Sequence, residues 1–254
     1  MTRAVLIGVT GRMGRALVRA AGGFPGLTIG AAVAAPASAA LGRDAGELAG
    51  VAPLNVAVTA DLRRALEVAD VAIDFSVPGA AAAHLAACRA ARKPLLIGTT
   101  ALAPELAGEL EAAARDIALL VAPNTSLAAT LLVELVRAAA AALPADFDLD
   151  ILEAHHRGKR DAPSGTALAL RQAAQASRAP QALREIAISV LRAGDLVGEH
   201  TALFTGAGEQ LALTHRASDR AIFARGALAA ALWLAPQPPG RYEMRDFIGL
   251  KTIG

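Results

Sequence analysis

Short apolar runs alternate with helical patterns along the first half of the chain. The apolar runs are rich in β-branched side chains and predict buried strands at 3–9, 27–33, 55–59, 68–75, 95–98 and 117–122. The patterns between them are rich in alanine and predict helices near 15–21, 61–68, 79–92 and 103–115. Strands that alternate with helices at this spacing predict a doubly wound α/β fold, in which crossover helices cover both faces of a parallel sheet.

The pattern changes in the second half. A long helix over 126–142 precedes a strand over 147–153 and a polar, basic loop, after which another helix begins near Gly165. Further strands, separated by glycine turns, follow near 186–191, 199–205 and 209–216. Strands joined by short turns predict an antiparallel or mixed sheet, and therefore a second domain of the α+β type. The stretch 221–234 predicts an apolar helix that packs against another element, and 236–240 is typical of a turn.

Composition excludes several classes of protein. The 254 residues are 54% hydrophobic and the mean hydropathy is +0.43, but alanine contributes much of this value. No run of about 18 apolar residues occurs, so we expect no transmembrane helix and no membrane partner. The apolar run near the N-terminus is too short for a signal peptide, which predicts a cytoplasmic protein. The formal net charge is +2 without a long basic run, so no nucleic-acid partner is expected.

Two rare residue types are informative. The one cysteine, Cys88, excludes an intramolecular disulfide framework and a cysteine-type zinc site. It lies in an alanine-rich helical pattern, where a small buried thiol is favoured over a nucleophile. Lysine occurs only at Lys93, Lys159 and Lys251, whereas arginine is common, so an individual lysine carries more information than usual.

Three glycines punctuate the turn between the first predicted strand and the first helix. Such a turn lets the backbone approach a pyrophosphate, and the N–H groups at the start of the helix face its charge. The spacing is GxxGxxG, with Val9 where the usual GxGxxG pattern has its first glycine. We therefore predict a Rossmann-like dinucleotide site that includes Gly8, Thr10, Gly11, Arg12, Met13 and Gly14.

Polar residues also follow two later strands. Ser76 comes after the fourth strand, and Gly98, Thr99 and Thr100 come after the fifth. Ligands lie beyond the carboxyl ends of the strands in an open parallel sheet, so these residues are candidates to hold the nicotinamide or its ribose. The alternative, that they only cap the following helices, weighs equally for Ser76 and less for the other three.

The stretch 153–166, EAHHRGKRDAPSGT, carries the densest chemistry. It holds two of the five histidines and one of the three lysines, and Ser-Gly-Thr at the start of a helix offers N–H donors to a carboxylate. The alternative is a solvated basic loop in which Ser164 caps the helix. Adjacent histidines rarely chelate one ion, so no metal site is expected. The loop suits an acidic substrate and a proton donor, whereas His200 and His215 are expected to be structural, although a site contact at the GEH strand start stays open.

Together these segments resemble the 4-hydroxy-tetrahydrodipicolinate reductase (dihydrodipicolinate reductase) family. The resemblance covers nearly the whole chain in collinear order, through GVTGRMGRAL, DFSVPGA, GTT, APN, EAHHRGKRDAPSGTAL, RAGDLVGEHT, LTHRASDR and YEMRDFIGL. It implies a homotetramer that uses NADPH or NADH to reduce the cyclic product of aspartate semialdehyde and pyruvate to tetrahydrodipicolinate, in lysine and diaminopimelate synthesis. It also implies a dinucleotide-binding domain, 1–125 with 221–254, and a domain for substrate and oligomerisation, 126–220.

The resemblance assigns roles to individual residues. His155 matches the proton donor and Lys159 the second catalytic cation. The residues that match the substrate site, which takes a small dicarboxylate, are His156, Ser164, Gly165 and Thr166, with Arg220 a weaker candidate. The residues that match the cofactor site are Gly8, Arg12, Met13 and Gly98 to Thr100, with Ala122, Pro123 and Asn124 at a hinge beside the nicotinamide.

The chain departs from the family pattern in four places. Gly158 stands where histidine is common, Thr125 stands where phenylalanine is common, and the loop over 179–186 is short. The segment 34–37, which follows the second strand, has no acid to bind the ribose hydroxyls, so both cofactors are expected to work. NADPH is modestly favoured because Arg12 can pair with a phosphate. Two alternatives stay open: a nucleotide-sensing relative with altered catalysis, and another Rossmann oxidoreductase that acts on an amino acid.

Overall fold

A computed structural model of the chain describes residues 1–177 and 185–249. The described residues divide into two compact units, one formed by 1–125 with 221–249 and the other lying within 126–220. Parts of two predicted regions lie outside the described residues: most of the short 179–186 loop, and the last five residues of the predicted dinucleotide-binding domain, 250–254.

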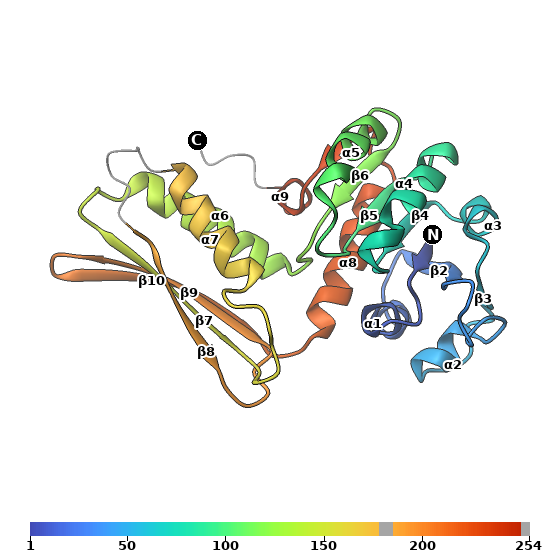
Figure 1. Ribbon diagram of the computed structural model, residues 1–254, viewed down its shortest axis with the longest axis horizontal. Helices are drawn as coiled ribbons and strands as arrows, with labels where there is room; N and C mark the ends of the chain where they lie inside the picture. Colours follow the sequence, from blue (N-terminus) through green and yellow to red (C-terminus); the bar gives the residue numbers. More distant parts are fainter. Residues whose placement is uncertain (178–184, 250–254) are drawn as a thin grey trace. The chain divides into compact units, whose positions relative to one another are not determined.

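The first unit is built on a parallel sheet of seven strands. Its order is β11-β6-β5-β4-β1-β2-β3 (Figure 1). The strands, all paired in parallel, are β1 (Thr2–Ile7), β2 (Leu27–Val33), β3 (Val58–Thr59), β4 (Val71–Asp74), β5 (Leu95–Ile97), β6 (Ala118–Val121) and β11 (Gly240–Tyr242). The order reverses between β1 and β4, the type of place where a doubly wound sheet binds ligands beyond its carboxyl edge.

Helices cover both faces of this sheet. They are α1 (Arg12–Ala21), α2 (Ala45–Ala49), α3 (Leu62–Glu67), α4 (Ala81–Ala90), α5 (Ala107–Ala114), α8 (Ala221–Leu234) and α9 (Met244–Phe247), with 3₁₀ turns at Pro78–Ala80 and Pro104–Leu106. Alternate residues of β1 enter different cores: Leu6 packs in one with Leu17 of α1 and Leu228 of α8, whereas Val5 packs in the other with Leu85 of α4. Because β1 is buried on both faces, its sequence is a continuous apolar run. The parallel sheet with helices on both faces confirms the predicted doubly wound fold.

Some boundaries differ from the sequence prediction. β1 ends at Ile7, two residues early, because Gly8 turns the chain with a φ of +85°. The helix α2 was not predicted; its N-cap is Asp44, whose side chain accepts hydrogen bonds from Gly46 and Glu47. The predicted turn over 236–240 is wrong at its end, since Gly240 begins the edge strand β11, which pairs with β6.

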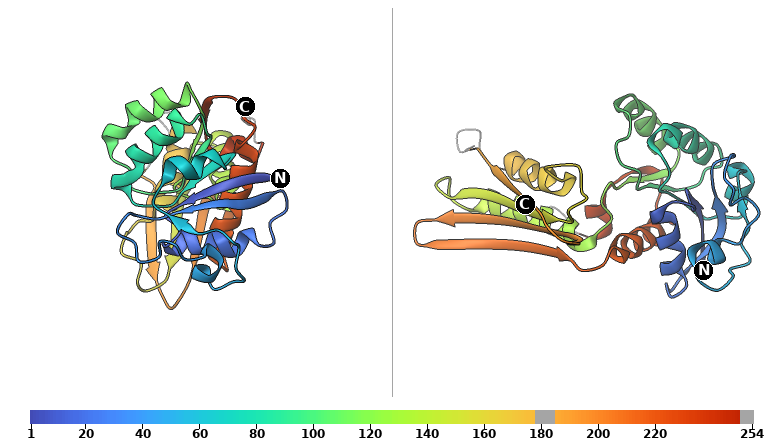
Figure 2. Two further views of the ribbon diagram at one scale, coloured as in Figure 1. Left: turned by 90° about the vertical axis from the view of Figure 1, so that its right-hand side faces the viewer. Right: turned by 60° about the horizontal axis from the view of Figure 1, so that its bottom comes forward.

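The second unit contains a four-stranded mixed sheet with two helices on one face (Figures 1 and 2). Its strands, in the order β10-β9-β7-β8, are β7 (Asp148–His155), β8 (Ala187–Arg192), β9 (Gly198–Gly206) and β10 (Glu209–Ala217). β7 pairs in parallel with β8 and antiparallel with β9, so the predicted mixed sheet is confirmed. The helices α6 (Leu127–Ala142) and α7 (Gly165–Ser177) pack on it through Val136, Leu170 and their neighbours.

Two features of this unit prepare the site. Ser126, which was predicted to be the first helical residue, is instead the N-cap of α6 and accepts the Ala129 N–H at 3.3 Å. β7 extends two residues beyond its predicted end, so that His155 is the last strand residue and is buried rather than part of a loop.

Across the described part of the chain, none of the helices combines the length and apolarity that a membrane span requires.

Candidate active site

The glycine turn after β1 is shaped for close backbone approach. A Cβ on Gly8 would lie 2.8 Å from the carbonyl oxygen of Phe75, at the end of the neighbouring strand β4. A Cβ on Gly14 would overlap the Gly8 carbonyl oxygen and the Val9 backbone, so only glycine lets α1 pack this tightly on the turn. Gly8 and Gly14 therefore fit the tight turn and close helix packing of a dinucleotide-binding loop.

The start of α1 offers N–H donors to an anion. Gly11 is the N-cap residue, and no side chain caps the helix there. Arg12, the first helical residue, is exposed, while Thr10 and Met13 are half-buried. Amides without a side-chain cap, next to a cation and to backbone that a Cβ would block, fit the pyrophosphate of a nicotinamide dinucleotide.

A polar cluster that the sequence did not predict lies at the end of β4. Asp74 is fully buried, and its Oδ2 lies 2.8 Å from Nδ1 of His84 on α4. Asp74 Oδ1 accepts the Ser76 N–H at 2.8 Å, and the Ser76 hydroxyl lies 3.3 Å from the same His84 nitrogen. Ser76 thus interacts with His84 and does not cap a helix, so its position after β4 is fixed by two side chains.

The other predicted cofactor residues follow the neighbouring strands. Gly98 donates its N–H to the Asp74 carbonyl at 2.8 Å, and Thr99 donates its hydroxyl to the same oxygen at 3.4 Å. Ala122 donates to the Ile97 carbonyl at 2.8 Å, which places 122 beyond β6. Thr100 and Pro123 are exposed, and Asn124 is half-buried. These residues therefore lie at the carboxyl edge of β4, β5 and β6, which the glycine turn after β1 shares.

Thr125 has a specific contact where the family commonly has phenylalanine. Its hydroxyl donates to the carbonyl oxygen of Phe223 in α8 at 2.7 Å, although the side chain is almost fully buried. A Cβ on Gly226 would overlap the Thr125 carbonyl oxygen, so the backbone of 125 lies directly against α8. The Thr125 side chain is thus held by a hydrogen bond to the backbone of α8.

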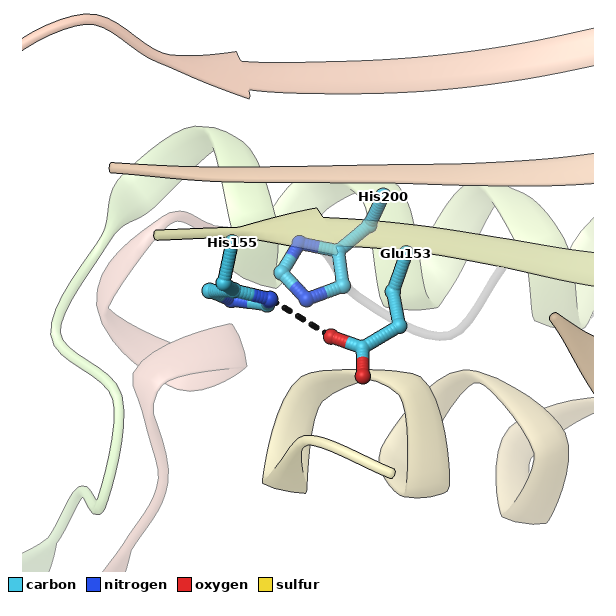
Figure 3. A group of neighbouring side chains, drawn as sticks. All are labelled: Glu153, His155 and His200. Carbon is cyan, nitrogen blue, oxygen red and sulfur yellow. Dashed lines mark ion pairs between the residues drawn. The ribbon is translucent and has the colours of Figure 1, made fainter. Parts of the chain in front are cut away.

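In the second unit, Glu153 and His155 of β7 form a buried pair (Figure 3). Both side chains point to the covered face of the sheet, because alternate strand residues share a face. Glu153 Oε2 lies 2.6 Å from His155 Nδ1, although the two atoms are not aligned as a hydrogen bond. Glu153 Oε1 accepts the Arg192 Nη2 donor at 2.9 Å and the Ser164 N–H at 3.2 Å.

Burial and neighbouring charges set the ionisation of this pair. Burial lowers the pKa of His155 most; the Glu153 charge opposes that effect, and the charges of Lys159 and Arg192 add to it, so the pKa lies below the ordinary 6.5. Burial alone would raise the pKa of Glu153, but hydrogen bonds from Arg192 and Ser164 hold it below its usual range. In the absence of a ligand, Glu153 is therefore ionised and His155 is largely neutral at pH 7.

Lys159 lies in a tight turn after β7. Its N–H donates to the His156 carbonyl at 3.1 Å, and its Nζ lies 2.8 Å from Asp161 Oδ2. The hydrogen bond from Lys159 is the main cause that lowers the pKa of Asp161. The charge of Lys159 also acts on His155, so the two predicted catalytic residues lie in one electrostatic cluster.

His200 belongs to this cluster, which agrees with the site contact left open for the start of its strand. Its Nε2 lies 3.0 Å from the Ser164 hydroxyl, and its ring meets the ring of His155 edge to face at 5.0 Å. Burial lowers the pKa of His200 to about 4, so the ring is neutral at pH 7. His215 stacks on His200 at 6.4 Å and lies 3.4 Å from the Ser126 hydroxyl. The pairing of β7 with β9, which aligns Glu153 with His200, brings these residues together.

The remaining predicted substrate residues lie close by in sequence, and one lies apart. The Ser164 hydroxyl caps α7 by accepting the Ala167 N–H at 3.2 Å, so the capping alternative is also correct. Gly165 is exposed, and His156 and Thr166 are half-buried beside Lys159 and Ser164 in the chain. Arg220 is exposed beyond β10, and no ion pair among the described residues joins it to the cluster.

The cluster also resembles a metal-binding arrangement. Glu153, His155 and His200 each offer one ligand atom, and these atoms lie within 4.8 Å of one another. Glu153 Oε1 already accepts a hydrogen bond from Arg192 Nη2 at 2.9 Å, and the positive charge of this guanidinium would repel a metal cation bound to the same carboxylate. A histidine beside charged residues and a helix start instead suits proton transfer to an anionic ligand.

One cavity lies apart from these residues. It has a volume of about 600 Å³, lies along α4 and α5, and includes the ion pair of Arg89 with Asp116. It shares no lining residue with the predicted cofactor or substrate sites.

Comparisons with known proteins agree along the whole chain. The model of the N-terminal part of dihydrodipicolinate reductase matches residues 2–125, and that of the C-terminal part matches 128–248. The 4-hydroxy-tetrahydrodipicolinate reductase of Alkalilimnicola ehrlichii is 47% identical over 98% of this chain and 99% of its own. That of Anaeromyxobacter dehalogenans strain 2CP-1 is 45% identical over 99% of both chains.

The fold is also similar to solved structures. The dipicolinate-bound dihydrodipicolinate reductase from Paenisporosarcina sp. TG-14 matches with a TM-score of 0.81 at 24% identity, over 98% of this chain and 99% of that one. An amine dehydrogenase from Mycobacterium smegmatis matches with a TM-score of 0.63 at 17% identity, over 95% and 94%. The Paenisporosarcina structure supports the fold. The two family models and the relatives at 45–47% identity show the family: the chain belongs to the dihydrodipicolinate reductase family.

Proposed function

We propose that the Glu153–His155 cluster and the start of α7 form the site at which this reductase converts 4-hydroxy-tetrahydrodipicolinate to tetrahydrodipicolinate, in lysine and diaminopimelate synthesis. The observation that carries the proposal is a buried histidine next to a lysine, an arginine and a helix start, all in one cluster. A bound nicotinamide cofactor, NADPH or NADH, would supply the hydride. His155 and Lys159 are the proposed catalytic residues, with His156, Ser164, Gly165, Thr166 and Arg220 around the substrate.

Each group has a separable task. The Ser164 N–H is engaged by Glu153 and the Ala167 N–H by the Ser164 hydroxyl, so the Gly165 amide at the start of α7 would bind one carboxylate. Lys159 would leave Asp161 to face the other carboxylate, where its charge becomes more favourable as negative charge develops. A dianionic substrate raises the pKa of His155 and so favours its protonated form. His155 then donates that proton to the atom that gains electron density after hydride addition.

We expect pyridine-2,6-dicarboxylate, a planar analogue of the substrate, to inhibit competitively and to bind more tightly when reduced cofactor is present. The similar Paenisporosarcina protein was solved with dipicolinate bound. In the proposed site, both carboxylates of pyridine-2,6-dicarboxylate would have cationic or N–H partners. Pyridine-2-carboxylate has only one carboxylate, so it should bind at least about tenfold more weakly, a loss of roughly 1.4 kcal/mol in binding free energy. Titration calorimetry with each ligand measures this; equal affinity for the two would contradict the dicarboxylate assignment.

We expect NADPH to be favoured over NADH by about 1–2 kcal/mol in kcat/KM, the value of one charge-assisted contact. β2 ends at Val33, and the segment 34–37 that follows has no acid to repel a 2′-phosphate or to bind the ribose hydroxyls. Arg12 is exposed at the start of α1 and is the proposed phosphate contact. Arg12→Ala should reduce this preference more than it reduces turnover with NADH.

Steady-state rates with both cofactors test this preference. Arg63→Ala is the matched control, since Arg63 is exposed on α3 and its loss removes the same charge from the same unit. A preference of tenfold or more for NADH would mean that another group reads the ribose. Binding of both nucleotides without any oxidation of reduced cofactor would instead favour the nucleotide-sensing alternative.

We also propose that the second unit forms the contacts of a homotetramer. The helices α6 and α7 cover one face of its sheet, and the other face is left open by the described elements (Figure 2). Leu152 and Leu191 point to the open face, with 43% and 54% of their surfaces exposed. Exposed apolar side chains on a flat sheet face are typical of a subunit contact. Sedimentation equilibrium of the chain measures the assembly, and a monomer would contradict it.

A further inference from the structure

Glu153 is a buried carboxylate to which the family resemblance gives no role. Its side chain is fully buried, and it contacts His155, Arg192 and the Ser164 N–H within 3.2 Å. A buried carboxylate is costly unless it is fully paired, and replacing an entire buried ion pair with well-packed apolar residues is often neutral or stabilising. Its position in the core-facing row of β7 therefore calls for a reason beyond stability.

The two nitrogen-bearing edges of the His155 ring have different surroundings. The Nδ1 edge faces Glu153 Oε2 at 2.6 Å (Figure 3). At the opposite edge, a Cβ on Gly198 would lie only 3.1 Å from Nε2 and 3.3 Å from Cδ2. Glycine at the start of β9 thus leaves space beside Nε2 that a larger residue would fill. The ring has one edge held by charge and the other edge kept open.

We propose that Glu153 is a positioning residue for the proton donor: its carboxylate keeps the Nδ1 edge of His155 inward and protonated, so that Nε2 carries the proton that is transferred. This proposal rests on the proposed function. In the transfer step the Nε2–H bond breaks and its proton goes to the substrate, while the neutral ring keeps the Nδ1 proton facing Glu153. The Ser164 N–H on the other carboxylate oxygen links this ring orientation to the start of α7.

Five groups around His155 determine how its charge responds. Glu153 of the same strand favours the charged ring, and Arg192 of β8 and Lys159 of the following turn oppose it. His200 of β9 contacts the ring and is neutral at pH 7, and Asp161 is paired with Lys159. Removing the charge of Glu153 and removing the charge of Arg192 should therefore change the protonation of His155 in opposite directions. A carboxylate that did not orient the ring would leave the neutral tautomer of His155 unchanged when its charge is removed.

The test compares Glu153→Gln, Glu153→Asp and Arg192→Gln in the full-length protein. Nitrogen-15 NMR titration of His155, assigned with His155→Gln, follows its pKa and its neutral tautomer without a need for turnover. Glu153→Gln keeps an acceptor for Arg192 and Ser164 but presents an amide to Nδ1, so we expect a lower pKa, by about one unit or a tenfold change in the equilibrium, and more of the Nε2–H tautomer. Glu153→Asp keeps the negative charge, so the pKa of His155 in this variant should lie closer to that of the unmodified protein than the pKa in Glu153→Gln does.

Arg192→Gln should raise the pKa of His155, and the alkaline limb of the kcat profile should follow it upward. The inference is overturned if both substitutions move the pKa in the same direction, or if neither moves it while activity falls. If Glu153→Gln does not fold, Glu153→Asp and Arg192→Gln still decide the outcome. The proposed function fails separately, by the absence of dicarboxylate binding or turnover in the unmodified protein, because the NMR measurement requires neither.

Discussion

Replacing Lys159 with alanine should lower kcat by about 10²–10³-fold, the effect of removing one charge that stabilises developing negative charge. The fold should survive, because the pair of Lys159 with Asp161 is partly exposed and pairs of this kind contribute about 0–1 kcal/mol. Steady-state turnover together with thermal unfolding separates the two effects. The rate loss should appear with either cofactor, since Lys159 belongs to the second unit.

Lys93→Ala is the matched control for Lys159. Lys93 lies between α4 and β5 in the first unit, whereas the cluster belongs to the second. Its substitution therefore removes one lysine charge from outside the cluster. Its turnover should stay close to that of the unmodified protein. A Lys159→Ala variant that also turns over within a few-fold of the unmodified protein would remove Lys159 from the catalytic residues.

Replacing His155 with glutamine should lower kcat by about 10²–10⁴-fold, the range that a general acid contributes. The dissociation constant for the dinucleotide should change little, because His155 lies in the second unit and the glycine turn lies in the first. Equilibrium binding of NADPH to the same variant is the internal control. Loss of dinucleotide affinity with an intact fold would show that His155 serves the cofactor instead.

The pH profile provides a second readout for His155. Burial lowers its pKa in the free protein, and only the protonated ring can donate, so kcat/KM should fall as pH rises through a pKa below 6.5. In the complex, the dianionic substrate raises that pKa, so the same limb in kcat should lie at higher pH. Both limbs should disappear in His155→Gln. Coincident limbs in kcat and kcat/KM would mean that the substrate charges do not act on this ring.

The fold could be predicted from the sequence wherever an element is long and its period is clear. The ranges of β2 and α8 agree with those predicted, because both are continuous apolar segments with distinct ends. The short elements α2 and β11 could not be predicted from periodicity. A capping aspartate, Asp44, defines one of them, and pairing with a distant edge strand, β6, defines the other.

The site was predicted only in part, for a similar reason. Dense local chemistry singled out His155, Lys159 and Ser164, which lie close together in the chain. Glu153 and His200 complete the cluster through the register of β7 and β9, and no local pattern shows that register. The signal that could have found Glu153 is its place two residues before His155, which puts both on one face of a strand. That inference required the strand to extend to 155.

The alternation along β7 has a consequence for how this protein tolerates changes in length. Leu149 and Ile151 face the core, and Glu153 and His155 continue the same row. One residue inserted into or deleted from the strand would turn these four side chains to the other face of the sheet. The burial of Leu149 and Ile151 and the orientation of His155 would then be lost together. The β9–β10 turn carries no such double duty, since changes there move no residue of the row. Insertions scanned across the second unit should therefore separate into a tolerant hairpin tip and a strand in which folding and turnover fail together.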